Sequence, residues 1–144
     1  MCRDDQTLNI CMGKAGSFTA SMRRFKTKVR EKQTAVFRQS VQDVMEDAQT
    51  PVQQGGRMHV DTGFLRASLQ SSLNGTTALS GPDSYSLAIA TASFGDTYFG
   101  GWTASYAKAR EFGSRGQAPD FFMRGAAQKW QAIVRANARK IKDD

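Results

Sequence analysis

Few side chains in this chain have the types and spacing from which active sites are built. His59 is the only histidine, so any histidine-based catalytic triad or zinc site would depend on that one residue. The segment His59-Val60-Asp61 can place two metal ligands on one side of an extended stretch. Because nothing else nearby in the sequence completes a site, we predict a solvated turn here and no metal centre.

The carboxylates also favour structural roles. Asp43 and Asp47 share one face of an expected helix, as a carboxylate pair might, but they lie beside a basic stretch, where solvated surface charge is the simpler interpretation. Glu111 lies in a tight segment without a second catalytic group, and we predict that it pairs with an arginine such as Arg66 or Arg124. The sequence therefore predicts no catalytic residue, no metal and no cofactor, and a protein that is not an enzyme.

An aromatic, glycine-rich stretch, Phe94–Ser105, is the other candidate for binding, as a hairpin tip or as a loop that reaches a partner. Tyr98, Phe99 and Trp102 can stack on nucleic-acid bases, as in single-strand binders. No Lys or Arg is interleaved with them, which favours anchors of a protein interface or of the core instead. We take these three aromatics as candidate interface residues.

Length and composition indicate one domain preceded by a leader. The 144 residues, 40% of them hydrophobic, suffice for a single modest core. Residues 1–19 are expected to form a flexible N-terminal leader and residues 20–144 the single domain. The leader has neither the glycine spacing of a phosphate-binding loop nor the apolar stretch of a secretory signal, and we expect its Cys2 and Cys11 to stay reduced in a cytoplasm. No apolar run approaches the length needed to span a bilayer, so no membrane partner is expected.

Positive charge is concentrated at both ends of the chain, whose net charge is +7. Residues 14–42 carry eight basic side chains and one acidic one, residues 124–142 carry six and none, and residues 61–123 have a net charge of −1. Such stretches attract phosphate backbones or acidic protein surfaces. The alternative is a solvated helix face, which is favoured because the cations between Arg23 and Lys28 point in several directions on a helix.

Hydrophobic spacing predicts an α+β fold. Apolar residues recur every three or four positions over Ala20–Val52 and over Phe121–Lys142, which indicates a long N-terminal and a C-terminal helix. The first should start near Ser17 or Thr19 and end before Pro51. The further expected elements are a short helix over Gly63–Leu69, strands at Leu69–Leu73, Thr76–Leu79 and Tyr85–Ala92 with a hairpin turn at Asn74-Gly75, and a strand or short helix at Tyr106–Phe112. The two long helices would pack on one face of a small antiparallel sheet.

Three stretches, in this order, resemble the tail-component family of long-tailed bacteriophages, known as tail-completion or minor tail proteins. Residues 61–69 resemble the family signature Asp-Thr-Gly-x-Leu-Arg-x-Ser-Ile, residues 106–114 are similar to Tyr-Ala-x-x-x-Glu-Phe-Gly-Thr, and residues 119–126 look like Pro-x-Phe-(Leu/Met)-Arg-x-Ala. The positions that carry the resemblance are Asp61, Thr62, Gly63, Leu65, Arg66, Ser68, Tyr106, Glu111, Phe112, Gly113, Pro119, Phe122 and Arg124. Asp120 and the aromatic content of residues 94–105 depart from the pattern, so contacts between subunits are expected to differ there.

These motif residues suit a scaffold. We expect Thr62, with Asp61, to cap the short helix, Leu65 and Leu69 to face the core, Gly113 to permit a tight turn and Pro119 to start the last helix. None of these is a reacting group.

The resemblance implies a structural virion protein that is assembled in the host cytoplasm. Such subunits form a ring, commonly a hexamer, at the head-proximal end of the tail, where they complete the tail and join it to the neck. The implied partners are further copies of the chain, the tail terminator or tail tube protein, head–tail connector proteins, and packaged DNA in the lumen. A tail terminator, a head-side connector and a stand-alone basic DNA-binding protein remain as alternatives.

Overall fold

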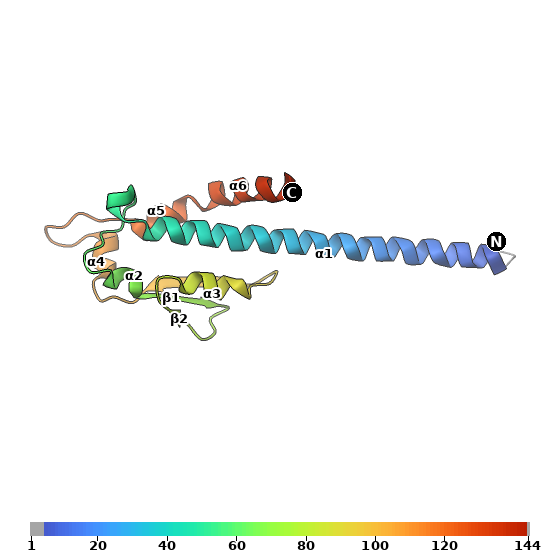
Figure 1. Cartoon of the computed structure of the whole chain (residues 1–144), viewed down its shortest axis with the longest axis horizontal. Coiled ribbons are helices and arrows are strands. Elements are labelled where there is room, and N and C mark those ends of the chain that lie inside the picture. Colours follow the sequence, from blue (N-terminus) through green and yellow to red (C-terminus); the bar gives the residue numbers. More distant parts are fainter. Residues whose placement is uncertain (1–4, 144) are drawn as a thin grey trace.

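A computed structural model describes the backbone of residues 5–143 and the side chains of residues 16–143, and it has an α+β fold (Figure 1). In chain order the elements are α1 Asp5–Gln49, the 3-10 helix η1 Val52–Gln54, α2 Phe64–Ala67, β1 Leu69–Leu73, β2 Leu79–Ser80, α3 Ser84–Ala90, β3 Tyr98–Trp102, α4 Ala107–Phe112, α5 Phe122–Gln128 and α6 Trp130–Asp143. The predicted fold class is confirmed.

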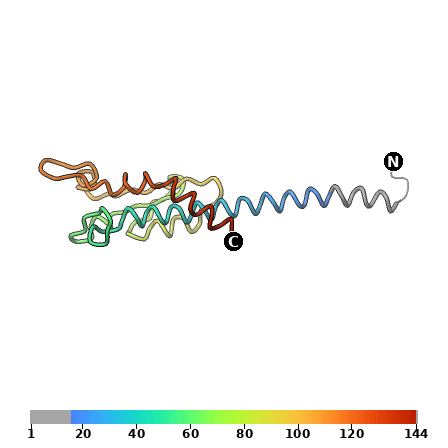
Figure 2. Tube along the Cα trace, turned by 90° about the horizontal axis from the view of Figure 1, so that it is seen from above, coloured from blue at the N-terminus to red at the C-terminus, as the bar shows by residue number. Residues whose placement is uncertain are grey.

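Helix α1 is the axis of the molecule. The C-terminal helices α5 and α6 run along one side of its second half, and α3 with the sheet lies on the opposite side (Figure 1). The first half of α1 extends beyond this body (Figure 1), and in the turned view the coloured part of the helix, from residue 16 on, projects in the same way (Figure 2). The buried residues that α1 contributes to the hydrophobic core cluster, Val41 and Met45, therefore lie in its C-terminal half.

The sheet has three antiparallel strands in the order β2-β1-β3. Strand β1 lies where the sequence predicts it, and the turn at Asn74-Gly75 is confirmed: both residues have positive φ, and Thr76 N–H donates to Leu73 O at 3.0 Å. Strand β2 is short and begins only at Leu79. The main pairing of β1 is with β3, from Leu69 opposite Trp102 to Leu73 opposite Tyr98.

Two predictions of secondary structure are wrong in this region. Tyr85–Ala92 is not a strand, because Ser84–Ala90 forms helix α3 and its buried side chains Tyr85, Ala88 and Ile89 follow helical spacing. Over so short a segment, the alternation of large and small residues matches the pattern expected of a strand although the backbone is helical. The stretch Phe94–Ser105 is not a loop, since its middle is strand β3.

The helix boundaries also differ from the expected ones. Helix α1 begins at Asp5 and not near Ser17 or Thr19, so residues 5–19 of the expected flexible leader continue the helix, and residues 1–4 lie outside the described part of the chain. Its end at Gln49, two residues before Pro51, is as predicted. The expected single C-terminal helix is divided at Lys129 into α5 and α6.

The core consists of two apolar clusters that meet at Trp102. One joins α1, β1 and α3 and contains the buried residues Val41, Met45, Leu69, Tyr85 and Ile89. The other lies beneath α2, α4 and α5 and contains the buried residues Met58, Leu65, Ala104, Ala107 and Phe122. Leu65 and Leu69 face the core as predicted, one in each cluster.

Polar contacts fasten the C-terminal helices to α1. Buried Asn137 donates its amide hydrogens to Asp43 Oδ2 at 2.8 Å and to Ser40 Oγ at 3.3 Å, and Lys129 Nζ pairs with Asp47 Oδ1 at 2.7 Å. The two carboxylates that share a helix face are thus not merely solvated charges. They hold α6 and the α5–α6 junction in place.

Candidate functional site

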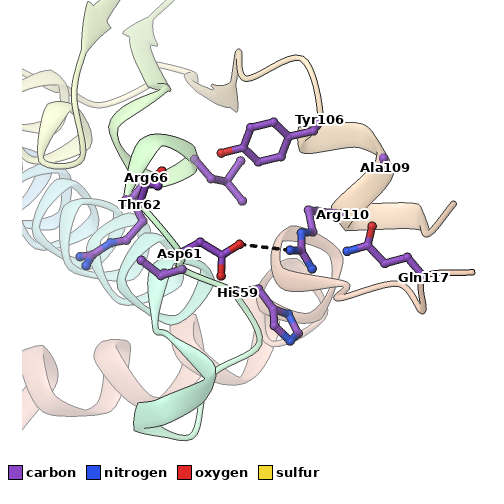
Figure 3. A pocket seen from close by; sticks show the side chains of 11 residues that line it. His59, Asp61, Thr62, Arg66, Tyr106, Ala109, Arg110 and Gln117 are labelled. Atoms are coloured by element: carbon purple, nitrogen blue, oxygen red, sulfur yellow. Dashed lines mark ion pairs between the residues drawn. The ribbon is translucent and has the colours of Figure 1, made fainter.

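The three stretches that resemble the phage family meet at the end of the body opposite the N-terminus of α1 (Figure 1). The first two line a cavity of about 400 Å³, shown in Figure 3. Its lining residues are His59, Val60, Asp61, Thr62, Gly63, Leu65, Arg66, Tyr106, Ala109, Arg110 and Gln117. The cavity therefore brings together residues that are about 45 positions apart in the sequence, such as Asp61 and Tyr106.

In the first stretch, residues 61–69, the two ends of helix α2 are formed by Gly63 and Ser68 and not by Thr62. Gly63 takes the N-cap position of α2 with φ 78°, and no side chain caps this helix, so the predicted cap by Thr62 and Asp61 is wrong. At the other end, Ser68 Oγ donates to Leu65 O at 2.7 Å and Thr103 N–H donates to Ser68 O at 3.0 Å. Ser68 thereby closes α2 and fixes the start of β1 against the end of β3.

An ion pair joins the first stretch to the second. Asp61 Oδ2 lies 3.6 Å from Arg110 Nη2 across the cavity (Figure 3). With its amide oxygen turned toward Arg110, Gln117 accepts a hydrogen bond from Arg110 Nε at 3.1 Å. Arg66 extends away from Arg110 (Figure 3), and its Nε is buried without a hydrogen-bond partner among the described residues.

Buried Glu111 joins the second stretch to the third. Its carboxylate accepts hydrogen bonds from the backbone N–H groups of Met123 at 2.9 Å and Arg124 at 2.8 Å. These are first-turn donors of α5, whose N-cap residue Phe121 has no capping side chain of its own. The predicted ion pair with Arg66 or Arg124 is wrong: Glu111 is a capping residue supplied from a distant part of the sequence.

Arg124 packs on aromatic rings of the same two stretches. Its guanidinium carbon lies 5.1 Å from the ring centre of Phe112 and 5.7 Å from that of Phe121, which are cation–π distances. Phe112 remains half exposed. On the first stretch, Phe64 lies against Tyr106 with ring centres 6.2 Å apart, and both rings are also exposed to solvent.

Gly113 turns the chain between α4 and α5 as predicted. Its φ of 83° with ψ of 164° lies in a region open almost only to glycine, and an added Cβ would come within 3.1 Å of Gln117 O and 3.2 Å of Pro119 Cδ. Pro119 does not start the last helix, because α5 begins only at Phe122. Phe122 is buried and meets Trp102 edge to face with ring centres 5.0 Å apart.

His59 is exposed to solvent as predicted, but it lies in an irregular segment and not in a turn. Its Nδ1 lies 2.8 Å from Oδ1 of Asp120, whose side chain is only 3% exposed, while the imidazole is half exposed. The second carboxylate oxygen of Asp120 has no hydrogen-bond partner among the described residues. No group of three or more His, Cys, Asp or Glu side chains that could hold a metal occurs in the described part of the chain.

The three candidate interface aromatics separate into two kinds. Tyr98 and Trp102 pack against the core, and the Tyr98 hydroxyl lies 2.9 Å from Ser71 Oγ, which in turn accepts from Ser84 Oγ at 3.0 Å. Burial raises the pKa of Tyr98 above its ordinary value. Phe99 alternates to the other face of β3, is 54% exposed and alone remains a candidate interface residue.

Comparisons with known proteins add no relative. No family model matches the chain, and no curated protein or solved structure was found to be similar to it. Within residues 5–143 there is no helix that is both long enough and apolar enough to cross a bilayer.

Proposed function

We propose that this chain is a structural virion protein of a long-tailed phage. Its copies form a ring at the head-proximal end of the tail, which completes the tail and joins it to the neck. The observation that supports the proposal best is that the three stretches resembling the tail-component family form one connected unit. Asp61 pairs with Arg110, and Glu111 caps the helix that carries Arg124.

A ring also requires a surface that one subunit leaves apolar. Phe64, Tyr106, Phe112 and Met123, all in the motif stretches, are exposed large side chains. They rest on a frame held by the Glu111 cap and the tight turn at Gly113. In this proposal they contact the neighbouring subunit, and the polar cavity beside them receives side chains of that subunit.

The proposed function includes no chemistry. Asp61 and Arg110 form an ion pair across the cavity, and His59 Nδ1 lies within hydrogen-bond distance of Asp120 Oδ1 beside it; in this proposal both contacts are structural. Tail terminator and head-side connector are alternative positions for the same kind of ring subunit.

A stand-alone DNA-binding protein is the second candidate. It is favoured by Arg23, Arg24, Lys26 and Lys28, which are exposed and have no ion pair within the described residues. Binding through these cations would weaken steeply as salt rises.

Negative-stain electron microscopy with mass determination tests the proposal, on the purified chain alone and mixed with tails that lack it. We expect rings, or density added at the head-proximal end of the tail. The Phe64→Ser/Tyr106→Ser variant should weaken ring formation, and Leu87→Ser, which removes an even more exposed apolar side chain from α3, should not. A chain that stays monomeric, ignores tails and binds duplex DNA at low salt would replace this proposal with the second candidate.

A further inference from the structure

The projecting half of α1 carries an apolar stripe that nothing in the described structure covers. Phe18, Met22, Phe25 and Val29 follow one another at steps of four, three and four residues, which places them along one side of the helix. Phe18 is 68%, Met22 51% and Phe25 63% exposed. This set is called the α1 stripe below.

The stripe ends in a groove against the body. Phe94, in the loop after α3, is 55% exposed. The guanidinium carbon of Arg30 lies over its ring, 5.5 Å from the centre of the Phe94 ring. Together with Met22, Phe25 and Val29, Phe94 lines a hollow of about 550 Å³. The stripe is thus continuous with a concave, mainly apolar surface where α1 meets the body.

The spacing of the stripe indicates what shape of partner fits it. Steps of four and three are those of the a and d positions of a heptad, with Phe18 and Phe25 at d and Met22 and Val29 at a. Lys26 and Lys28 then occupy the e and g positions that border such a seam. A narrow apolar stripe that is flanked by charged side chains fits another helix, whereas helices that lie in a bilayer surface have a broader apolar face.

Charge indicates the chemistry of that helix. Residues 16–33 carry six basic side chains and one acidic one. Lys32 already donates to Ile141 O and Arg30 stacks on Phe94, but Arg23, Arg24, Lys26 and Lys28 form no ion pair within the described residues. Carboxylates on the partner would therefore meet free cations on both sides of the seam.

A second copy of the chain does not supply those carboxylates. Its own projecting half has the same excess of positive charge. Its one acidic side chain beside the stripe is Glu31, and the next ones along α1, Asp43, Glu46 and Asp47, are occupied by Asn137, Gln42 and Lys129 respectively. Nucleic acid would satisfy the cations and leave the apolar stripe in water.

We propose that the projecting half of α1 is a docking surface for an acidic amphipathic helix of another protein. The partner helix lays apolar residues on the α1 stripe and in the groove at Phe94, and its flanking carboxylates face Lys26 and Lys28. This surface is separate from the exposed side chains Phe64, Tyr106, Phe112 and Met123, the motif surface of the proposed ring, and the inference does not depend on that function.

Binding of designed peptides to the full chain tests the chemistry. The probe is a fluorescent 21-residue peptide of three heptads with Leu at a and d and Glu at e and g, and its counterpart has Lys at e and g. Fluorescence anisotropy should show that the acidic peptide binds at least about tenfold more tightly than the basic one. Equal affinity for both peptides, or no binding of the acidic one, would overturn the proposal.

Matched variants identify the surface. Met22→Gln/Phe25→Gln removes half of the stripe without changing charge and should weaken binding of the acidic peptide by about tenfold or more. Lys26→Glu/Lys28→Glu should reverse the preference toward the basic peptide. The control, Arg24→Glu/Lys140→Glu, changes charge equally at two exposed positions that do not line the groove and should keep the preference for the acidic peptide. A control that lowers affinity as much as Lys26→Glu/Lys28→Glu would show charge attraction without docking.

Three further outcomes each refute the inference in favour of another occupant. Self-association of the chain that Met22→Gln/Phe25→Gln abolishes would identify a second copy. Binding to vesicles containing anionic lipid, but not to the acidic peptide, would identify a membrane surface. Salt-sensitive binding to duplex DNA that the stripe variant leaves unchanged, again without peptide binding, would identify nucleic acid. Ring formation, measured on the same variants, reports separately on the proposed function and should be unaffected by the stripe substitutions.

Discussion

At the scale of single residues, buried polar groups decide how this chain is held together. Glu111 is the clearest case, because its carboxylate takes two backbone donors that the sequence of α5 leaves without a cap. A carboxylate at a helix N-terminus also interacts favourably with the positive end of the helix dipole. Glu111, for which the sequence predicts an ion pair with an arginine, therefore links the second motif stretch to the third through hydrogen bonds.

Replacement of Glu111 should destabilise the fold in a graded way. Glu111→Ala leaves the N–H groups of Met123 and Arg124 without their acceptor and should lower the free energy of unfolding by about 2–4 kcal/mol. Glu111→Gln keeps an oxygen acceptor and should cost less. Urea unfolding followed by circular dichroism measures both, with Glu31→Gln on exposed α1 as the control. If Glu111→Ala unfolds at the wild-type midpoint, the cap does not stabilise the body.

Two tyrosines, buried Tyr85 and partly buried Tyr98, should make stability fall at high pH. Burial raises the pKa of Tyr98 and of Tyr85, so each ionises more readily in the unfolded chain than in the folded one. A raised folded pKa contributes stability that is complete below the unfolded pKa, about 10, and is lost as pH rises through the folded value.

Urea unfolding at pH values from 8 to 11 tests this dependence. Tyr98→Phe should reduce the loss of stability at the alkaline end, although it costs the contact with Ser71 at every pH. Phe99→Ala, which removes an exposed and non-ionisable ring from the same strand, should leave the pH profile as it is in the wild type. A Tyr98→Phe profile parallel to that of the wild type would contradict the assignment.

At the scale of elements, local patterns predicted what local interactions determine. The end of α1 before Pro51, strand β1 and the turn at Asn74-Gly75 depend on residues within a few positions, and all three are confirmed. Strand β3 was missed because glycines interrupt its pattern and its partner β1 is some 30 residues away. Helix α3 was misassigned because seven residues are too few to separate helical from alternating periodicity.

The candidate site, too, is predictable from the sequence only where local interactions determine it. The sequence identified the segments that meet there, but not the contacts through which they meet. Two of these contacts join residues that are far apart in the sequence: Asp61 and Arg110 are about 50 positions apart, and His59 and Asp120 about 60. No rule based on local spacing predicts such pairs. The Glu111 cap has no signal in the sequence either, because a helix that begins at Phe121 would follow the capping residue Asp120, whereas α5 begins at Phe122 and its N-cap position falls on Phe121.

The turn that connects α4 to α5 should tolerate only glycine at position 113. Gly113→Ala would force a side chain into a strained backbone region and against Gln117 O, so we expect a loss of about 1–3 kcal/mol in the free energy of unfolding. Gly16→Ala is the matched control: it lies in open space on α1 and should leave stability unchanged or raise helix content. Equal unfolding midpoints for wild type and Gly113→Ala would show that the turn adapts.

At the scale of the whole molecule, the body and the projecting half of α1 differ in what stabilises them. Around Val41 and Met45 the helix is buried between α3 and α6, whereas residues 16–29 depend on backbone hydrogen bonds exposed to water. Most helical stability in proteins comes from packing of an apolar face, and isolated helices of this length are marginal in water. The described fold thus combines a packed unit, which includes the motif surface, with an extension whose apolar stripe lacks a partner.

Amide hydrogen exchange of the free chain should therefore divide α1 in two. We expect residues 16–29 to exchange with little protection and residues 40–49 to exchange slowly, since only the latter must unfold with the body to open. Exchange detected by mass spectrometry of proteolytic fragments measures this at a concentration where the chain is monomeric. Strong protection of residues 16–29 in the monomer would mean that the body covers the α1 stripe in solution, and the extension would then be unavailable to any partner.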